Sequence, residues 1–177
     1  MAGHNFAETL KLMVMISPNL QAAINRQINA ELWSAYLYLS MSMDAQNKGY
    51  PGIAQWLFAQ WEEEQTHAEK LVTFLTDRMA KVCLEAIESV KEEWDSPMEI
   101  FQDALAHERK VTKMINKLVE MAFADADYAS VSFLQWFVDE QVEEEKSVSD
   151  IITVLDRIEN SPCAMEELDH RLGERKK

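Results

Sequence analysis

The chain has 177 residues, of which 47% are hydrophobic and 27% are charged, with only four glycines and four prolines. This length suits one domain with a sizeable core, and the scarcity of Gly and Pro disfavours an all-β or a disordered chain. The net charge of −14 argues against nucleic acid or an anionic membrane as a partner and fits attraction of cations.

The sequence favours a cytoplasmic protein. Its two cysteines, Cys83 and Cys163, are too few for a disulfide scaffold, and no apolar run is long enough to span a membrane. The apolar stretch 10–16 lacks the basic segment and the cleavage site of a signal peptide. We therefore interpret residues 1–16 as an N-terminal tail and residues 17–177 as one helical domain.

Prolines mark the helix starts. Ser17-Pro18, Ser96-Pro97 and Ser161-Pro162 each pair an N-cap serine with a proline at the first helical position. Glu99 adds a capping box to the second of these starts, and Pro51 follows a chain break at 48–50. We predict helices at about 18–46, 51–79, 96–124, 127–157 and, as a short C-terminal helix, 162–172.

Core spacing and link lengths predict how these helices pack. The first helix carries apolar residues at helical core spacing, and so does the fourth. They are Ile24, Ile28, Leu32, Ala35 and Leu39, and then Phe133, Phe137, Val148, Ile151 and Leu155. Two links are short and imply antiparallel neighbours. The link at about 80–95 can span roughly 50 Å when extended, so the second and third helices can be parallel. The predicted fold is an all-α four-helix bundle with one long crossover and a short fifth helix.

The motif Glu64-x-x-His67 places a carboxylate and an imidazole on one helix face. Such a pair can bind one metal ion, although a lone Glu-x-x-His more often lies on a solvated face. The spacing of the surrounding acids favours a metal site over a solvated face. Glu31 and Glu64 are 33 residues apart, as are Glu108 and Gln141, and the second pair repeats the first at an offset of 77. We interpret this as an internal duplication of a helical hairpin.

The spacing of 33 has a geometric meaning. Residues equidistant from the turn of an antiparallel hairpin lie at the same height, and both pairs are centred on a predicted turn. Four helices should therefore present one polar group of residues near mid-bundle: Glu31, Glu64, His67, Glu108, Gln141 and Glu144. Buried carboxylates need cations to neutralise them, and a carboxylate-rich site with one imidazole suits a hard, redox-active metal such as iron.

One Glu from each of two helices and a Glu-x-x-His from each of the other two form the di-iron bundle pattern. The fourth helix departs from it, with Gln141 in place of Glu and Glu144 in place of His. The alternative interpretation is a set of exposed acids on amphipathic helices, but that does not explain matched heights on four helices.

The chain resembles bacterial non-haem ferritin over about residues 16–172. The resemblance depends on four segments: Asn29-Ala30-Glu31-Leu32-Trp33-Ser34-Ala35, Glu63-Glu64-Gln65-Thr66-His67, Ala106-His107-Glu108-Arg109, and residues 133–145 with the sequence FLQWFVDEQVEEE. It implies ferroxidase activity, in which Fe(II) is oxidised by dioxygen or peroxide and stored as ferric oxyhydroxide.

The resemblance also implies residue roles. Glu31, Glu64 and His67 would hold one iron, and Glu64 would bridge to a second iron held by Glu108. Gln141 would stand beside the pair and bind weakly, which would help Fe(III) to leave. A third iron site would use Glu63, Glu140, Glu143 and Glu144. Tyr38 and Trp136 match aromatic residues that could donate electrons, and they could equally be core aromatics.

Relatives of this kind form hollow cages of two dozen identical subunits, so a homo-oligomer is expected. Haem is not expected, because bacterioferritin needs a methionine where this chain has Gln65 and a complete second Glu-x-x-His. A miniferritin needs histidines on the first helix, and a rubrerythrin usually carries a Cys-rich segment. A non-catalytic helical interaction module is the alternative from another functional class.

Overall fold

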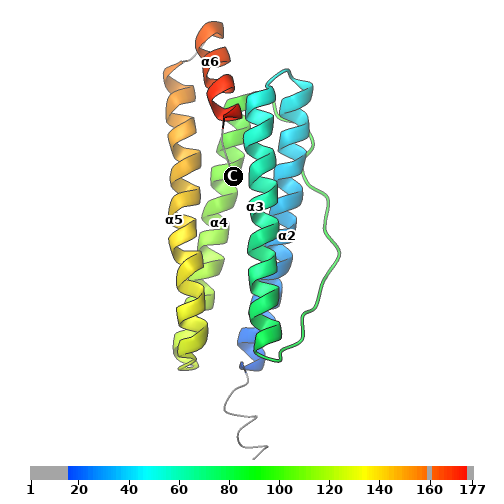
Figure 1. The fold of residues 1–177 in the computed structure, drawn as a ribbon, viewed down its shortest axis with the longest axis vertical. Helices are drawn as coiled ribbons and strands as arrows, with labels where there is room; N and C mark the ends of the chain where they lie inside the picture. Colours follow the sequence, from blue (N-terminus) through cyan, green and yellow to red (C-terminus); the bar gives the residue numbers. More distant parts are fainter. Residues whose placement is uncertain (1–15, 159–160, 175–177) are drawn as a thin grey trace, which may run out of the picture.

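The computed structural model describes residues 16–158 and 161–174, and the expectation of a tail before residue 16 lies outside the described residues. Four long helices lie side by side, and a short fifth helix packs against α3 at one end of the bundle (Figure 1). Their bounds are α2 Pro18–Asn47, α3 Pro51–Asp77, α4 Pro97–Ala124, α5 Tyr128–Arg157 and α6 Pro162–Gly173. The predicted fold class is confirmed. None of these helices is long and apolar enough to cross a membrane.

The predicted helix starts are confirmed. Proline opens α2, α3, α4 and α6, and the side chains of Ser17, Ser96 and Ser161 each accept a hydrogen bond from a backbone N–H of the first turn. The capping box is half formed, because Glu99 accepts from the backbone N–H of Asp95 at 2.6 Å instead of from the cap residue.

The second helix ends before its predicted end at residue 79. It stops at Asp77, and Met79 has a φ of 53°, in the left-handed region that stops a helix. The chain then runs along the outside of α2 and returns to the far end of the bundle, where α4 begins (Figure 1). This long crossover makes α3 and α4 parallel, as the length of the link predicted.

The crossover is held by polar side chains of α2. Asn25 donates to the carbonyl of Lys81 at 2.9 Å and accepts from the N–H of Cys83 at 2.6 Å. One helical turn later, Asn29 makes the same pair of bonds to the carbonyl of Cys83 and the N–H of Glu85. Backbone groups without a partner would be costly, so these two amides supply what a neighbouring strand would supply in a sheet.

The apolar core is divided into two clusters. One contains Leu37, Leu57, Phe101 and Val148 among others, and the other contains Ile28, Leu71, Val111 and Phe137 among others. Each long helix passes from one cluster to the other through a short polar segment that is still buried. A layer of polar side chains therefore crosses the bundle between two apolar regions.

Three residues at predicted core spacing are only half-buried. Leu39 lines a groove between α2 and the crossover, together with Val90, and Leu32 packs at the edge of one apolar cluster. Phe133 stacks face to face on Phe74 with ring centroids 3.9 Å apart. The spacing therefore identified positions at the edge of an apolar cluster for Leu32 and Phe133, whereas Leu39 lies against the crossover instead.

The short helix α6 is fixed to the start of α3. The carboxylate of Asp169 accepts hydrogen bonds from the N–H groups of Gly52 and Ile53 at 3.0 and 2.8 Å, which satisfies donors that the first turn of a helix leaves free. A Cβ on Gly52 would lie 1.7 Å from the carbonyl oxygen of Asp169. Only glycine permits this close approach.

Gly52→Ala should push α6 away from the bundle and lower stability by about 1–3 kcal/mol, the usual cost of overpacking. A Cβ on Gly173 would lie 3.2 Å from the Cα of Gly52, so Gly173→Ala is the matched control and should cost less. Thermal unfolding of both variants checks this. Equal melting temperatures for Gly52→Ala and the wild type would show that α6 does not depend on the contact.

Candidate metal centre

The polar layer contains all six side chains that the spacing predicted at mid-bundle. Each of the four long helices contributes, and every one of the six is at most 4% exposed. They are Glu31 from α2, Glu64 and His67 from α3, Glu108 from α4, and Gln141 and Glu144 from α5. Their roles as ligands remain predictions, but the structure places them together.

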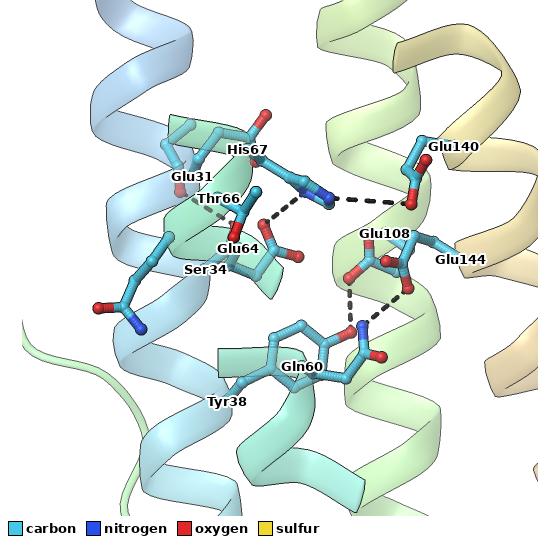
Figure 2. Close-up of polar contacts among 12 residues, drawn as sticks. Glu31, Ser34, Tyr38, Gln60, Glu64, Thr66, His67, Glu108, Glu140 and Glu144 are labelled. Carbon is cyan, nitrogen blue, oxygen red and sulfur yellow. Dashed lines mark hydrogen bonds and ion pairs between the residues drawn. The ribbon is translucent and has the colours of Figure 1, made fainter. Parts of the chain in front are cut away.

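Glu31, Glu64 and His67 form a compact group that could hold a cation. One potential ligand atom from each lies within 4.8 Å of the others, and His67 Nδ1 is 3.4 Å from Glu64 Oε2 (Figure 2). The group combines two helices, because Glu31 lies on α2 and the other two lie one turn apart on α3.

His67 also belongs to a second possible ligand group, with Glu140 and Glu144 of α5. Its other ring nitrogen, Nε2, lies 4.0 Å from Glu140 Oε1. Figure 2 shows the imidazole between Glu64 on one side and Glu140 on the other. One histidine therefore connects two acidic groups.

Glu108 lies beside these groups and is held by hydrogen bonds from two directions. The Tyr38 hydroxyl donates to Glu108 Oε1 at 2.5 Å, and Gln141 Nε2 donates to Glu108 Oε2 at 3.3 Å. The amide nitrogen of Gln141, and not its oxygen, therefore faces Glu108.

The chemistry of this site fits a hard cation. Glu31 Oε2 and Glu64 Oε2 are buried and accept no hydrogen bond within the described part of the chain. A buried carboxylate oxygen without a donor is costly, and a divalent cation between the two would remove that cost. Carboxylates with one imidazole match the ligand preference of iron.

Burial is the largest cause of the raised pKa values of Glu31, Glu64 and Glu108. Loss of hydration raises the pKa of Glu31 to about 7, against the opposing hydrogen bond from Gln27. Burial and the charge of Glu108 hold the pKa of Glu64 well above its usual range, and burial raises the pKa of Glu108 too. A cation that binds here must therefore displace protons.

Two further titratable groups of the layer, His67 and Tyr38, are neutral near pH 7. Burial, and then the charge of Lys70, lower the pKa of His67 to about 4, so one of its two ring nitrogens has a lone pair for a metal. Burial and the charge of Glu108 keep the pKa of Tyr38 well above 10. Tyr38 is therefore a neutral phenol that donates to Glu108.

The remaining predicted residues lie at the edge of the site. Glu63 and Glu140 are half-buried and Glu143 is exposed. Burial raises the pKa of Glu140, and the charges of Glu143 and Glu63 raise it further, so the three acids share one electrostatic environment. Trp136 makes an edge-to-face contact with His67, with ring centroids 5.5 Å apart.

Sequence reasoning missed two buried glutamines that orient the acids. Gln27 Nε2 donates to Glu31 Oε1 at 2.9 Å, and Gln60 Nε2 donates to Glu144 Oε2 at 2.8 Å. A signal was present, because each glutamine precedes a predicted ligand by four residues. The two glutamines are also separated by the same 33 residues as Glu31 and Glu64.

Comparison with known proteins gives consistent results. Residues 21–158 match a family model described as a ferritin-like domain. The chain is 39% identical to a bacterial non-heme ferritin of Bacteroides fragilis over 161 residues, which are 91% of this chain and 100% of that protein. It is 41% identical to a bacterial non-heme ferritin of Staphylococcus epidermidis over 144 residues, 81% of this chain and 87% of that protein.

Solved structures agree. An open-pore ferritin of the hyperthermophilic archaeon Archaeoglobus fulgidus is 46% identical and superposes with a TM-score of 0.90, covering 91% of this chain and 99% of that one. A protein described as a humanized archaeal ferritin is 44% identical, also with a TM-score of 0.90, and covers 91% and 98% of the two chains.

The buried acids should make stability of the metal-free protein depend on pH. The folded state raises the pKa of Glu31 from 4.5 to about 7, so it retains a proton that the unfolded chain has lost, and stability falls as pH rises through this window. His67 has the opposite effect, but only between about 4 and 6.5. Between about pH 6.5 and 7.5 the last part of the Glu31 contribution should be visible, after most of the His67 contribution has ended.

We expect the melting temperature of chelator-treated protein to fall less between these two pH values in Glu31→Gln than in the wild type. The exposed Glu120 supplies the matched control, Glu120→Gln, which should behave as the wild type does. An unchanged pH dependence in Glu31→Gln would mean that Glu31 titrates normally in the folded protein.

Proposed function

The chain belongs to the ferritin family, and we propose that it oxidises Fe(II) to Fe(III) at a di-iron centre within each subunit, with dioxygen or peroxide as oxidant. The product is stored as ferric oxyhydroxide inside a protein cage. The observation that carries this proposal is a pair of buried carboxylate oxygens beside a neutral imidazole, Glu31 Oε2 and Glu64 Oε2, which accept no hydrogen bond from the residues that the structure describes.

The candidate ligands form two binding positions for Fe(II). Glu31, Glu64 and His67 supply ligand atoms for one Fe(II), since those atoms lie within 4.8 Å of one another. Glu108 supplies a carboxylate for the second, and Glu64 is the candidate to bridge the two. Placing two cations side by side allows both to deliver electrons to one oxidant molecule.

Protons are exchanged as iron binds. The raised pKa values of Glu31, Glu64 and Glu108 mean that Fe(II) replaces protons on acids that burial otherwise keeps partly neutral. The Tyr38 hydroxyl, 2.5 Å from Glu108 Oε1, holds that carboxylate in place. Tyr38 is also a candidate electron donor.

A route outwards is provided by the second acidic group. His67 is shared with Glu140 and Glu144, and the negative environment continues to the half-buried Glu63 and the exposed Glu143. We assign these acids to a third iron position, through which oxidised iron moves towards the mineral. Its ligands are more exposed than those of the first group, which suits a cation that passes through.

The ferroxidase assignment predicts a specific loss in Glu31→Gln/Glu64→Gln. Both substitutions keep side-chain volume and remove the charges that attract Fe(II), so the fast phase of ferric absorbance after Fe(II) is added in air should fall to the rate without protein. Glu120→Gln, which removes an exposed acid of α4, should retain the fast phase. Fast oxidation in the double variant would remove the site assignment.

The storage assignment predicts a large particle. The monomer mass is 20.4 kDa, and light scattering should give about two dozen times that value if the chain forms the closed shell that symmetric oligomers of this size require. A monomer or dimer at micromolar concentration would contradict storage inside a cage while leaving the ferroxidase assignment intact.

A further inference from the structure

A surface groove of about 340 Å³ between α4 and α5 leads to the metal centre from the side. Its lining includes Thr112 of α4, Gln141 and Glu145 of α5, and the apolar side chains of Ile115 and Val138. Gln141 is 4% exposed and touches Glu108, so the groove ends one side chain away from a candidate ligand. Thr112 and Glu145 have no role in the proposed function so far.

The Thr112 hydroxyl donates its hydrogen to acceptors other than Gln141. Thr112 Oγ1 lies 2.6 Å from Glu145 Oε1 and 3.0 Å from the backbone carbonyl oxygen of Glu108. The shorter contact is to a carboxylate, which makes the stronger bond. Arg109 Nε lies 3.7 Å from the other oxygen of Glu145 and helps to keep that carboxylate in place.

The hydrogen bond from Thr112 to Glu145 fixes the orientation of the Gln141 amide. Because its hydrogen points to Glu145, Thr112 Oγ1 can only accept from Gln141, whose Nε2 lies 3.3 Å away. The backbone oxygen and Oε2 of Glu108, each 3.3 Å from the same nitrogen, are acceptors as well. Three acceptors therefore face the NH₂ group, and the amide oxygen points elsewhere.

We propose that Thr112 and Glu145 are positioning residues that hold Gln141 as a hydrogen-bond donor to Glu108 and keep its Oε1 from coordinating the cation at that position. A cation against Glu108 attracts the amide oxygen and repels the NH₂ group. Turning the amide would place Oε1 against Thr112 Oγ1, so that two oxygen lone pairs face each other without a hydrogen between them. The iron beside Glu108 therefore has one ligand fewer and leaves more readily after oxidation.

This inference rests on the proposed di-iron centre and is tested with Co(II), whose visible absorption reports binding without oxidation. In Thr112→Val the shape is kept and one of the three acceptors that face the NH₂ group is gone, which lowers the cost of turning the amide. The amide can turn, and Co(II) at the weaker of the two positions should bind about three- to tenfold more tightly, the factor that one ordinary hydrogen bond represents. Turnover of Fe(II) beyond the first two equivalents should slow, because oxidised iron is retained.

Three further variants make the test specific. Thr112→Ser restores the hydroxyl and should restore wild-type Co(II) affinity, and Glu145→Ala should shift affinity in the same direction as Thr112→Val by a smaller factor. Thr153→Val is the matched control, because it removes a hydroxyl bonded only to a carbonyl one turn earlier on α5. Unchanged or weaker Co(II) binding in both Thr112→Val and Glu145→Ala overturns the proposal.

The experiments distinguish failure of the di-iron centre from failure of the positioning role of Thr112 and Glu145. If the wild-type protein binds no Co(II) and gives no fast Fe(II) oxidation, the di-iron centre itself is wrong. If the wild type does both and Thr112→Val and Glu145→Ala match it, only the positioning role is wrong.

Discussion

The polar layer across the middle of the bundle is the constraint on which the rest of the structure depends. Carboxylates from all four long helices meet there between two apolar clusters, and Glu31 and Glu64 each keep one buried oxygen that accepts no hydrogen bond from the part of the chain that the structure describes. Buried acids of this kind lower the stability of the bundle, and a divalent cation bound between them would relieve that cost. The apolar clusters on either side must therefore hold the helices in register without help from the layer itself.

The relative heights of the four long helices depend in turn on the links that connect them. Two short turns set the heights within each hairpin, and the crossover must run the length of the bundle to make α3 and α4 parallel. A segment of this length without helix or strand would expose many unpaired backbone groups. Asn25 and Asn29 bind it from α2, and the buried Trp94 fixes its far end through a bond from its indole nitrogen to Asp103. Polar residues on the outer side of α2 thus help indirectly to set the positions of the candidate ligands.

Much of this arrangement follows from the sequence, and the exceptions have physical causes. Proline and serine pairs predicted the helix starts, and the repeated spacing of 33 predicted which side chains meet, because both are set by local geometry. Gln27 and Gln60 were missed, since a glutamine next to a helix acid is usually solvated and only tertiary contact shows that it is buried. The orientation of Gln141 was beyond sequence reasoning as well, because it depends on where the hydroxyl of Thr112, on another helix, sends its hydrogen.

The two helical hairpins carry different side chains at matching positions, so the site is asymmetric. The first retains a carboxylate and an imidazole one turn apart, whereas the second carries Gln141 and Glu144 at the matching positions. Glu144 therefore faces His67 from α5, so one imidazole serves acids on both sides, and Gln141 becomes a donor to Glu108 instead of a second carboxylate. A symmetric site would hold two cations equally and retain both. In the proposed di-iron centre, the asymmetric arrangement would hold the cation at Glu31, Glu64 and His67 firmly and the one beside Glu108 loosely, so that the loosely held cation could leave as cargo.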